Sequence, residues 1–114
     1  MAVVNVSAGQ GAAEVATYNT FRQVQGTVSF RFTDISGYSF SSVRAQVRLR
    51  NQQGVIRADK WCYKTWGQLP AYTYMFNTNG IETVAFTVGV FDRYVEGNVG
   101  NVWISWAGQL YDQV

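Results

Sequence analysis

The sequence contains no histidine and a single cysteine, Cys62, among its 114 residues. Without histidine, the chain lacks the side chain that most often serves as a general base or a metal ligand near neutral pH. One thiol cannot form a disulfide within the chain, and Cys62 has no histidine or second cysteine with which to bind zinc or act as a supported nucleophile. We therefore expect a protein that is not an enzyme, with no catalytic residue, no metal site and no cofactor. We interpret Cys62 as a small buried apolar residue.

Charge is also scarce: 14% of the residues are charged, whereas 47% are hydrophobic and 16% are aromatic. A chain of this length and composition is expected to form one domain around one hydrophobic core. Few charges and many aromatics favour a protein that works in an assembly or outside the cell, because association covers surface that charge would otherwise keep solvated. Residues 1–16 have no basic segment and their apolar run is interrupted at Asn5, so we expect neither a signal peptide nor a membrane anchor there.

What is present is a repeated alternation of apolar and polar residues, which predicts β-strands in segments 27–33, 42–51, 83–91 and 101–108. The apolar members of each segment are expected to face the core. Turn-forming residues are expected to separate the strands at 34–37, 51–54, 79–80 and 97–101. Several short strands at this spacing predict an all-β fold, a single-domain antiparallel β-sandwich that is jelly-roll-like or immunoglobulin-like.

The first twenty residues differ from the rest because they are small and almost uncharged. We expect residues 1–20 to form an extended N-terminal arm or the first strand, and residues 21–114 to form the β-sandwich domain. An arm of this kind can lie across a neighbouring copy or add a strand to its open edge.

The segment Lys60–Trp66, KWCYKTW, holds two of the four tryptophans. We expect it to pair with residues 71–77 in a hairpin around residues 67–70. Counting the register back from that turn, one face of the hairpin carries Trp61, Tyr63, Tyr72, Tyr74 and Phe76. The other face carries Cys62, Met75 and Trp66. Both faces are largely apolar, so the face turned away from the core needs a cover, which can be the chain's own terminus, a ligand or another subunit.

Three interpretations of these aromatic residues remain open. Trp61 and Phe76 can be core residues, with the tyrosine hydroxyl groups reaching the surface. Exposed aromatic rings can instead stack on sugars, or they can form the desolvated centre of a protein interface, where Tyr, Trp and Arg are enriched. Trp103 is predicted to point away from the core side of its strand. The interface or ligand candidates are Trp61, Tyr63, Tyr72, Tyr74, Phe76 and Trp103.

A basic stripe is predicted on a single strand, because Arg44, Arg48 and Arg50 alternate with apolar residues. We expect Arg31 to join them if the first two strands form a hairpin. Such a stripe can bind phosphates. However, a sequence pI of about 8.8 and the absence of an aromatic RNA-binding motif argue against nucleic acid, which we do not expect as a partner. Arginines that pair with carboxylates at an interface explain the stripe equally well.

Charge is unevenly distributed along the chain. Residues 22–64 carry eight of the nine basic side chains and two acidic ones, whereas residues 65–114 carry one basic and four acidic side chains. Such polarity favours a head-to-tail contact between copies, in which the basic surface of one meets the acidic surface of the next.

Taken together, the sequence predicts a non-enzymatic structural protein that assembles into a larger particle by self-association or by joining a protein lattice. The most concrete version is a viral or phage virion component, such as a capsid decoration (cement) protein or a tail or fibre subunit, located in the virion. The alternative is a carbohydrate-binding, lectin-like module that uses Tyr63, Tyr72, Tyr74 and one tryptophan. A third, weaker alternative is a secreted protein with no ligand. If the protein is not viral, we expect it to be secreted, with its signal segment absent from this sequence. No membrane partner is expected.

Overall fold

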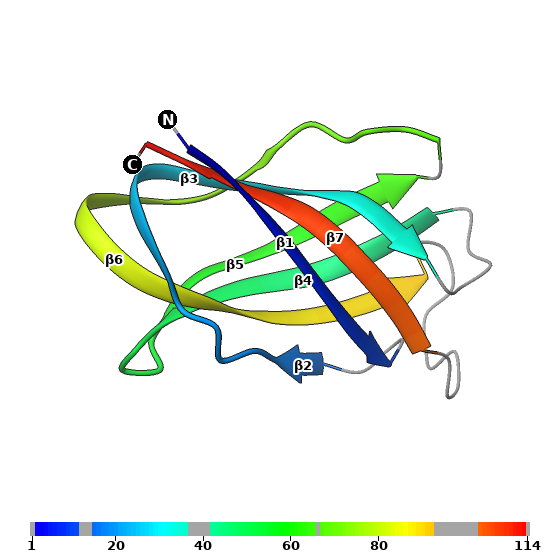
Figure 1. Ribbon diagram of the computed structural model, residues 1–114, viewed down its shortest axis with the longest axis horizontal. Helices are drawn as coiled ribbons and strands as arrows, with labels where there is room; N and C mark the ends of the chain where they lie inside the picture. The colour runs from blue at the N-terminus through cyan, green and yellow to red at the C-terminus, as the bar shows by residue number, and fades with distance from the viewer. Residues whose placement is uncertain (1, 12–14, 37–41, 66, 93–102, 114) are drawn as a thin grey trace.

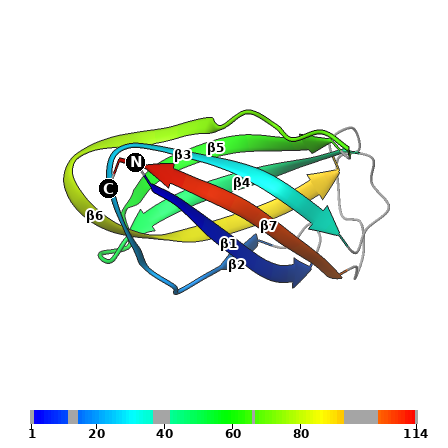
Figure 2. The ribbon, with the colours of Figure 1, turned by 45° about the horizontal axis from the view of Figure 1, so that its top comes forward.

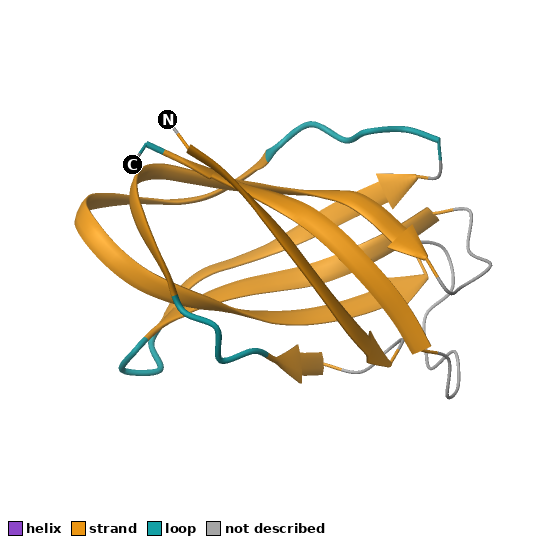
Figure 3. Cartoon of the chain, in the orientation of Figure 1, coloured by secondary structure: helices purple, strands orange, loops and turns teal. Residues whose placement is uncertain are grey.

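A computed structural model describes residues 2–11, 15–36, 42–65, 67–92 and 103–113 (Figure 1). Every regular element in these residues is a β-strand (Figure 3), which confirms the all-β prediction. The strands are β1 (Ala2–Gly11), β2 (Val15–Thr17), β3 (Arg22–Ser36), β4 (Ser42–Asn51), β5 (Ile56–Thr65), β6 (Thr73–Asp92) and β7 (Trp103–Asp112).

One antiparallel sheet of seven strands contains all of these elements, in the order β1-β7-β3-β6-β4-β5, with β2 pairing to β6 beside this path. The long strand β6 pairs with β3 through its first half, residues 73–84, and with β4 through its second half. The sheet therefore folds over at β6, which turns from one layer to the other at one end of the molecule (Figure 2). We call the two parts the β7 layer (β1, β7, β3 and the first half of β6) and the β4 layer (the second half of β6, β4, β5 and β2). Together they form a β-sandwich.

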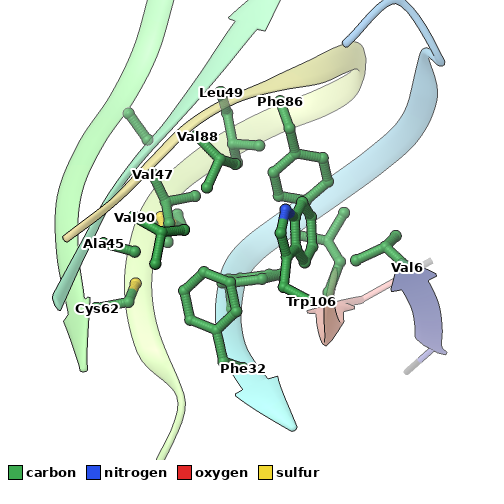
Figure 4. Packing of buried hydrophobic residues seen from close by; sticks show 14 of the residues in the cluster. Val6, Phe32, Ala45, Val47, Leu49, Cys62, Phe86, Val88, Val90 and Trp106 are labelled. Carbon is green, nitrogen blue, oxygen red and sulfur yellow. The ribbon is translucent and has the colours of Figure 1, made fainter. Parts of the chain in front are cut away.

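The core lies between the two layers, as the alternation predicts. Figure 4 shows valines of the β4 layer facing Phe32 and Trp106 of the β7 layer. The Trp106 ring centroid lies 5.5 Å from that of Phe32 and 6.2 Å from those of Phe30 and Phe86, all in edge-to-face arrangements. Each such pair contributes about 1 kcal/mol beyond the area it buries. The largest fully buried side chains are Phe30, Phe32, Ile35, Leu49, Ile104, Leu110, Val24, Val28, Val43, Val47, Val84 and Val88.

A buried amide joins the layers on the side where β1 and β2 lie. Gln10, 2% exposed, donates from Nε2 to the carbonyl oxygen of Val88 on β6 at 2.8 Å. Its Oε1 accepts from the Trp106 indole N–H at 3.0 Å and from the Tyr18 hydroxyl at 2.7 Å. Because an unbonded amide would be costly in the core, these three bonds explain why a glutamine is tolerated there.

The N-terminal residues belong to the sandwich. Strand β1 pairs with β7 along its whole length, from Ala2 opposite Asp112 to Gly11 opposite Trp103. The two ends of the chain therefore lie close together (Figure 1). Strand β2 then crosses to the β4 layer, where Ala16 lies opposite Val88.

Three of the predicted turns fall on described residues. The turn at 34–37 is wrong for residues 34–36, which continue strand β3, and residue 37 lies outside the described residues. The turn at 51–54 is confirmed: Gly54 has φ +83° and the Asn51 side-chain oxygen accepts from the backbone N–H groups of Gln53 and Val55. The turn at 79–80 is wrong, because the chain continues through it as β6. Residues 79–81 instead fall at a register shift between β3 and β6, where the sheet folds over. The segment predicted at 97–101 lies outside the described residues.

The predicted hairpin of residues 60–66 with 71–77 is wrong. Strand β5 pairs with β4, so Trp61 lies opposite Gln46 and Tyr63 opposite Arg44. Residues 73–78 pair with β3 instead. The two segments do lie near one another, but only through side chains: the Lys60 amino group lies 5.8 Å from the centroid of the Tyr74 ring. Trp66 lies outside the described residues.

Candidate functional site

The outer face of the β4 layer carries a cluster of aromatic rings around one arginine. Arg44 lies opposite Tyr63 of β5 on one side and Phe91 of β6 on the other. Its guanidinium carbon lies 5.3 Å from the centroid of the Trp61 ring, within the range of a cation–π contact. The Trp61 and Phe91 ring centroids lie 6.0 Å apart. We call Arg44, Trp61, Tyr63 and Phe91 the aromatic–arginine cluster.

The aromatic–arginine cluster is open to solvent. Trp61 is 42% exposed and Tyr63 is 46% exposed. Val15 of β2, 53% exposed, extends the apolar surface next to Phe91 because both side chains lie over Gly89. A Cβ added at Gly89 would lie 3.1 Å from the Phe91 ring and 3.2 Å from Val15, so glycine leaves the room that the ring occupies. An apolar strip on β5, β6 and β2 therefore surrounds Arg44 of β4.

Arg44 is incompletely satisfied in this position. Its Nε atom is buried and has no hydrogen-bond partner among the residues that the structure describes. Buried N–H donors are nearly always paired, so Arg44 keeps a donor that its described neighbours leave unused. The guanidinium is charged, and hydrogen bonds to charged groups are stronger than those between neutral groups.

A polar row lies next to the cluster. The Asp59 carboxylate accepts from Gln46 Nε2 at 3.0 Å and from Arg48 Nε at 3.1 Å. Gln46 lies directly opposite Trp61, so amide and carboxylate groups border the exposed indole. Arg50 donates to the carbonyl oxygen of Tyr18 at 2.7 Å. Arg44, Arg48 and Arg50 thus share one face of β4, as the alternation predicts, but two of them bind groups of their own chain.

Arg31 does not join this stripe. It lies on β3 in the β7 layer, because β6 separates β3 from β4 and the predicted first hairpin does not form. Its guanidinium donates to Gln109 Oε1 at 2.8 and 3.0 Å and lies 4.3 Å from the centroid of the Tyr72 ring. The prediction that the four arginines form one stripe is therefore wrong, and the reason is the strand order.

The predicted aromatic face is likewise divided between the two layers. Tyr72 packs on Tyr111 of β7, with 5.4 Å between ring centroids, and Tyr74, 51% exposed, lies opposite Ser29 of β3. Phe76 is buried, because a register shift between Val28 and Ser29 changes the alternation along β6. The single face predicted to carry Trp61, Tyr63, Tyr72, Tyr74 and Phe76 is therefore wrong.

Trp103 lies in the β7 layer, far along the sheet path from Trp61. Its side chain is 64% exposed, and its ring packs over Gly9 of the neighbouring strand β1. Ile104 and Trp106 are buried on the other side of β7, as predicted. The alternation therefore places Trp103 correctly, but it stands apart from the aromatic–arginine cluster.

Burial accounts for the chemistry of two side chains on the inner face of β5. Desolvation raises the pKa of Cys62 from 9.0 to about 11, and a side-chain hydrogen bond with Thr73 acts in the opposite direction. A thiol with this pKa is a poor nucleophile at neutral pH. Lys64, also buried, donates to the carbonyl oxygens of Thr65 and Gln68 and thereby holds the end of β5. Within the described ranges, no three His, Cys, Asp or Glu residues gather into a potential metal site.

Phe91 and Val15 were missed by sequence reasoning. In segment 83–91 the alternation buries Val90 and turns Phe91 to the opposite face, so the outward direction of Phe91 could have been predicted. Its closeness to Trp61 depends on β4 lying between β5 and β6, and sequence patterns do not give strand order. No helix in the described part of the chain has the length and hydrophobicity that crossing a membrane requires.

No protein-family model matches the sequence, and no curated protein matches it. Among solved structures, the chain is similar to one in a crystal structure of accessory secretory protein 1, 2 and 3 in Streptococcus pneumoniae, with a TM-score of 0.43 and 14% identity over 96% of this chain and 82% of that chain. It is also similar to a chain of infectious bursal disease virus Gt strain, with a TM-score of 0.41 and 14% identity over 96% of this chain and 30% of that chain. Neither likeness decides the function.

Proposed function

We propose that the protein is a non-enzymatic structural subunit that binds other protein subunits through the aromatic–arginine cluster and so joins a larger particle. The most concrete form of this proposal is a virion component, such as a capsid decoration protein or a tail or fibre subunit. The observation that carries the proposal is the combination of exposed Trp61 and Tyr63 with the unbonded Nε of Arg44 between them. Tryptophan, tyrosine and arginine dominate the energetic centres of protein interfaces.

The neighbouring residues support the same reading. Protein interfaces have an apolar centre and a polar rim. Here Phe91 and Val15 extend the apolar strip, and the bonded Asp59 and Arg48 border it. Because Arg48 and Asp59 already neutralise each other, a partner that covers this rim has few isolated charges to desolvate. An acceptor oxygen from the partner would satisfy Arg44 once the side chain turns its Nε–H group toward the surface.

Substituting the exposed tryptophan tests this proposal. Trp61→Ala is expected to weaken association by about 2 kcal/mol or more, a factor of about thirty in the dissociation constant, because it removes the largest ring of the cluster. Trp103→Ala is the matched control, since it removes a more exposed tryptophan from the other layer. Association is measured by sedimentation velocity across a concentration series. Equal association of Trp61→Ala and the unmodified protein would overturn the role of the cluster.

A carbohydrate-binding module is the second candidate function, and one observation favours it. Exposed Trp61 lies beside Gln46 and Asp59, and this combination of a stacking ring with amide and carboxylate groups can hold a pyranose. Arg44 covers part of the ring, which limits the surface left for stacking. A panel of simple sugars, read by tryptophan fluorescence, tests this candidate: a saturable change lost in Trp61→Ala supports it, and no change in any sugar opposes it.

A further inference from the structure

Three strands of the described sheet, β1, β5 and β2, pair with one other strand only, and two of them are protected against pairing with another chain. Strand β5 carries Arg57, Asp59, Lys60 and Lys64. Its open side is also covered by side-chain contacts with β6, including the Arg57–Glu82 ion pair, in which both hydrogen bonds are 2.8 Å long. Strand β2 has three residues and offers little backbone. Charges, covering groups and short length are the common devices that keep edge strands from pairing.

Strand β1 lacks these devices over most of its length. It is ten residues long, AVVNVSAGQG, with no charged residue and no proline. It pairs with β7 without a register shift, so no bulge twists it away. Its other side has no paired strand among the described residues. The Tyr18 hydroxyl approaches the carbonyl oxygen of Gly9 at 3.5 Å, so the open part of the edge is the stretch Val3–Ser7.

We infer that β1 pairs antiparallel with β1 of a second copy of this chain, around a two-fold axis at Asn5. The inference deepens the proposed function by naming a second contact surface of the same assembly. A two-fold axis perpendicular to the sheet keeps inner faces inside and outer faces outside, so only residues of the same face can lie opposite one another. An axis at Asn5 uses the whole open stretch. It places Val4 opposite Val6 of the second copy on the inner face, and Val3 opposite Ser7 on the outer face.

A second copy suits this edge better than a charged segment of another protein. Strand β1 carries no charge, so two identical copies of it can pair without repulsion. A charged strand of another protein would find no opposite charge on β1 to pair with. Val3 is 49% exposed, and pairing would cover it. The two β7 layers would then join into one continuous sheet, with β1 and its copy at the centre.

Charge substitutions at Asn5 test the inference, because this residue would lie opposite its own copy. Asn5 is exposed and accepts one long hydrogen bond from Gln109, 3.4 Å, so the fold should tolerate its replacement. Asn5→Lys and Asn5→Asp, each alone, are expected to raise the dimer dissociation constant about tenfold or more through like-charge repulsion. A mixture of the two is expected to form the heterodimer, because opposite charges then face each other. Gln52→Lys, in the exposed turn after β4, is the control of equal charge.

Native mass spectrometry and sedimentation velocity give the outcomes. With Trp61→Ala added throughout to remove the cluster contact, dimers of the protein with Asn5 intact and of its Gln52→Lys variant, monomers of each Asn5 variant, and a heterodimer in the mixture are the expected results. A monomeric unmodified protein up to about 100 µM, or dimers that ignore charge at Asn5, would overturn the inference. The single variants separate this inference from the proposed function. If Trp61→Ala abolishes all association and the Asn5 variants associate normally, the β1 contact alone is refuted. If the Asn5 variants lose all association and Trp61→Ala associates normally, the role of the aromatic–arginine cluster alone is refuted.

Discussion

Two substitutions of Gln10 test the polar link between the layers. Both should lower the free energy of unfolding, and for Gln10→Glu the loss should depend on pH. The Gln10 side chain makes three hydrogen bonds to described residues of the core, two as acceptor and one as donor. Gln10→Leu removes all three and leaves the Trp106 indole N–H without its acceptor. Three lost bonds at about 1 kcal/mol each are expected to lower the free energy of unfolding by about 3 kcal/mol at any pH. That is a large part of the stability of a domain this size.

Gln10→Glu has nearly the same shape but a different dependence on pH. Its carboxylate can still accept from Trp106 and Tyr18, but it cannot donate to the Val88 carbonyl oxygen. Burial and that oxygen both disfavour the charged form, so the pKa of the introduced carboxyl is raised above its ordinary value of about 4.3. The protonated acid restores the donor. Its stabilisation is therefore fully present below about pH 4.3 and is lost as pH rises through the folded-state pKa.

Urea unfolding followed by tryptophan fluorescence at pH 4 and pH 7 measures this effect. Relative to the unmodified protein at the same pH, Gln10→Glu should approach zero loss at pH 4 and lose about 3 kcal/mol at pH 7, whereas Gln10→Leu should lose the same amount at both. A Gln10→Glu protein as stable as the unmodified one at pH 7, or equal losses at both pH values, would refute the bonding assigned to Gln10.

Two further substitutions test the packing of the layers. Gly108→Ala should destabilise the protein by about 1–3 kcal/mol, because a Cβ there would lie 2.5 Å from the buried Phe30 ring and 2.8 Å from the Arg31 carbonyl oxygen. Gly80→Ala, with no atom within 4 Å of the added Cβ, is the control, and equal stability of the two variants in urea would contradict the packing. For Cys62, whose pKa rises from 9.0 to about 11 on folding, stability is fully present below pH 9 and falls between pH 9 and 11. Between pH 9 and 11, Cys62→Ala should lose about 3 kcal/mol less of its free energy of unfolding than the unmodified protein. Identical dependence on pH in the unmodified protein and Cys62→Ala would show that the thiol does not titrate as described.

The sequence predicted local structure well because alternation reports which side chains are buried. Val28, Phe30 and Phe32 are buried as expected, and Trp103 is exposed as expected. Alternation failed at Phe76, where a register shift reverses the face that a residue occupies. No residue pattern marks that shift in advance.

The grouping of the candidate residues was not predictable, because it depends on which strands are neighbours. Segments close in sequence were expected to form hairpins, but β4 lies between β5 and the second half of β6. This order brings Phe91 to Trp61 and takes Tyr72 and Arg31 to the other layer. The charges of the two sequence halves also meet within one chain, as the Arg57–Glu82 pair shows. Long-range pairing of this kind leaves little trace in a single sequence.

The central claim, that the protein works by assembling, is tested most directly by its mass in solution. Light scattering after size exclusion, across a concentration series with and without simple sugars, gives this mass. The account predicts a defined or concentration-dependent oligomer, heavier than the 12.8 kDa chain and unaffected by sugars. A 12.8 kDa monomer at every concentration, with tryptophan fluorescence that responds to a sugar, would contradict it.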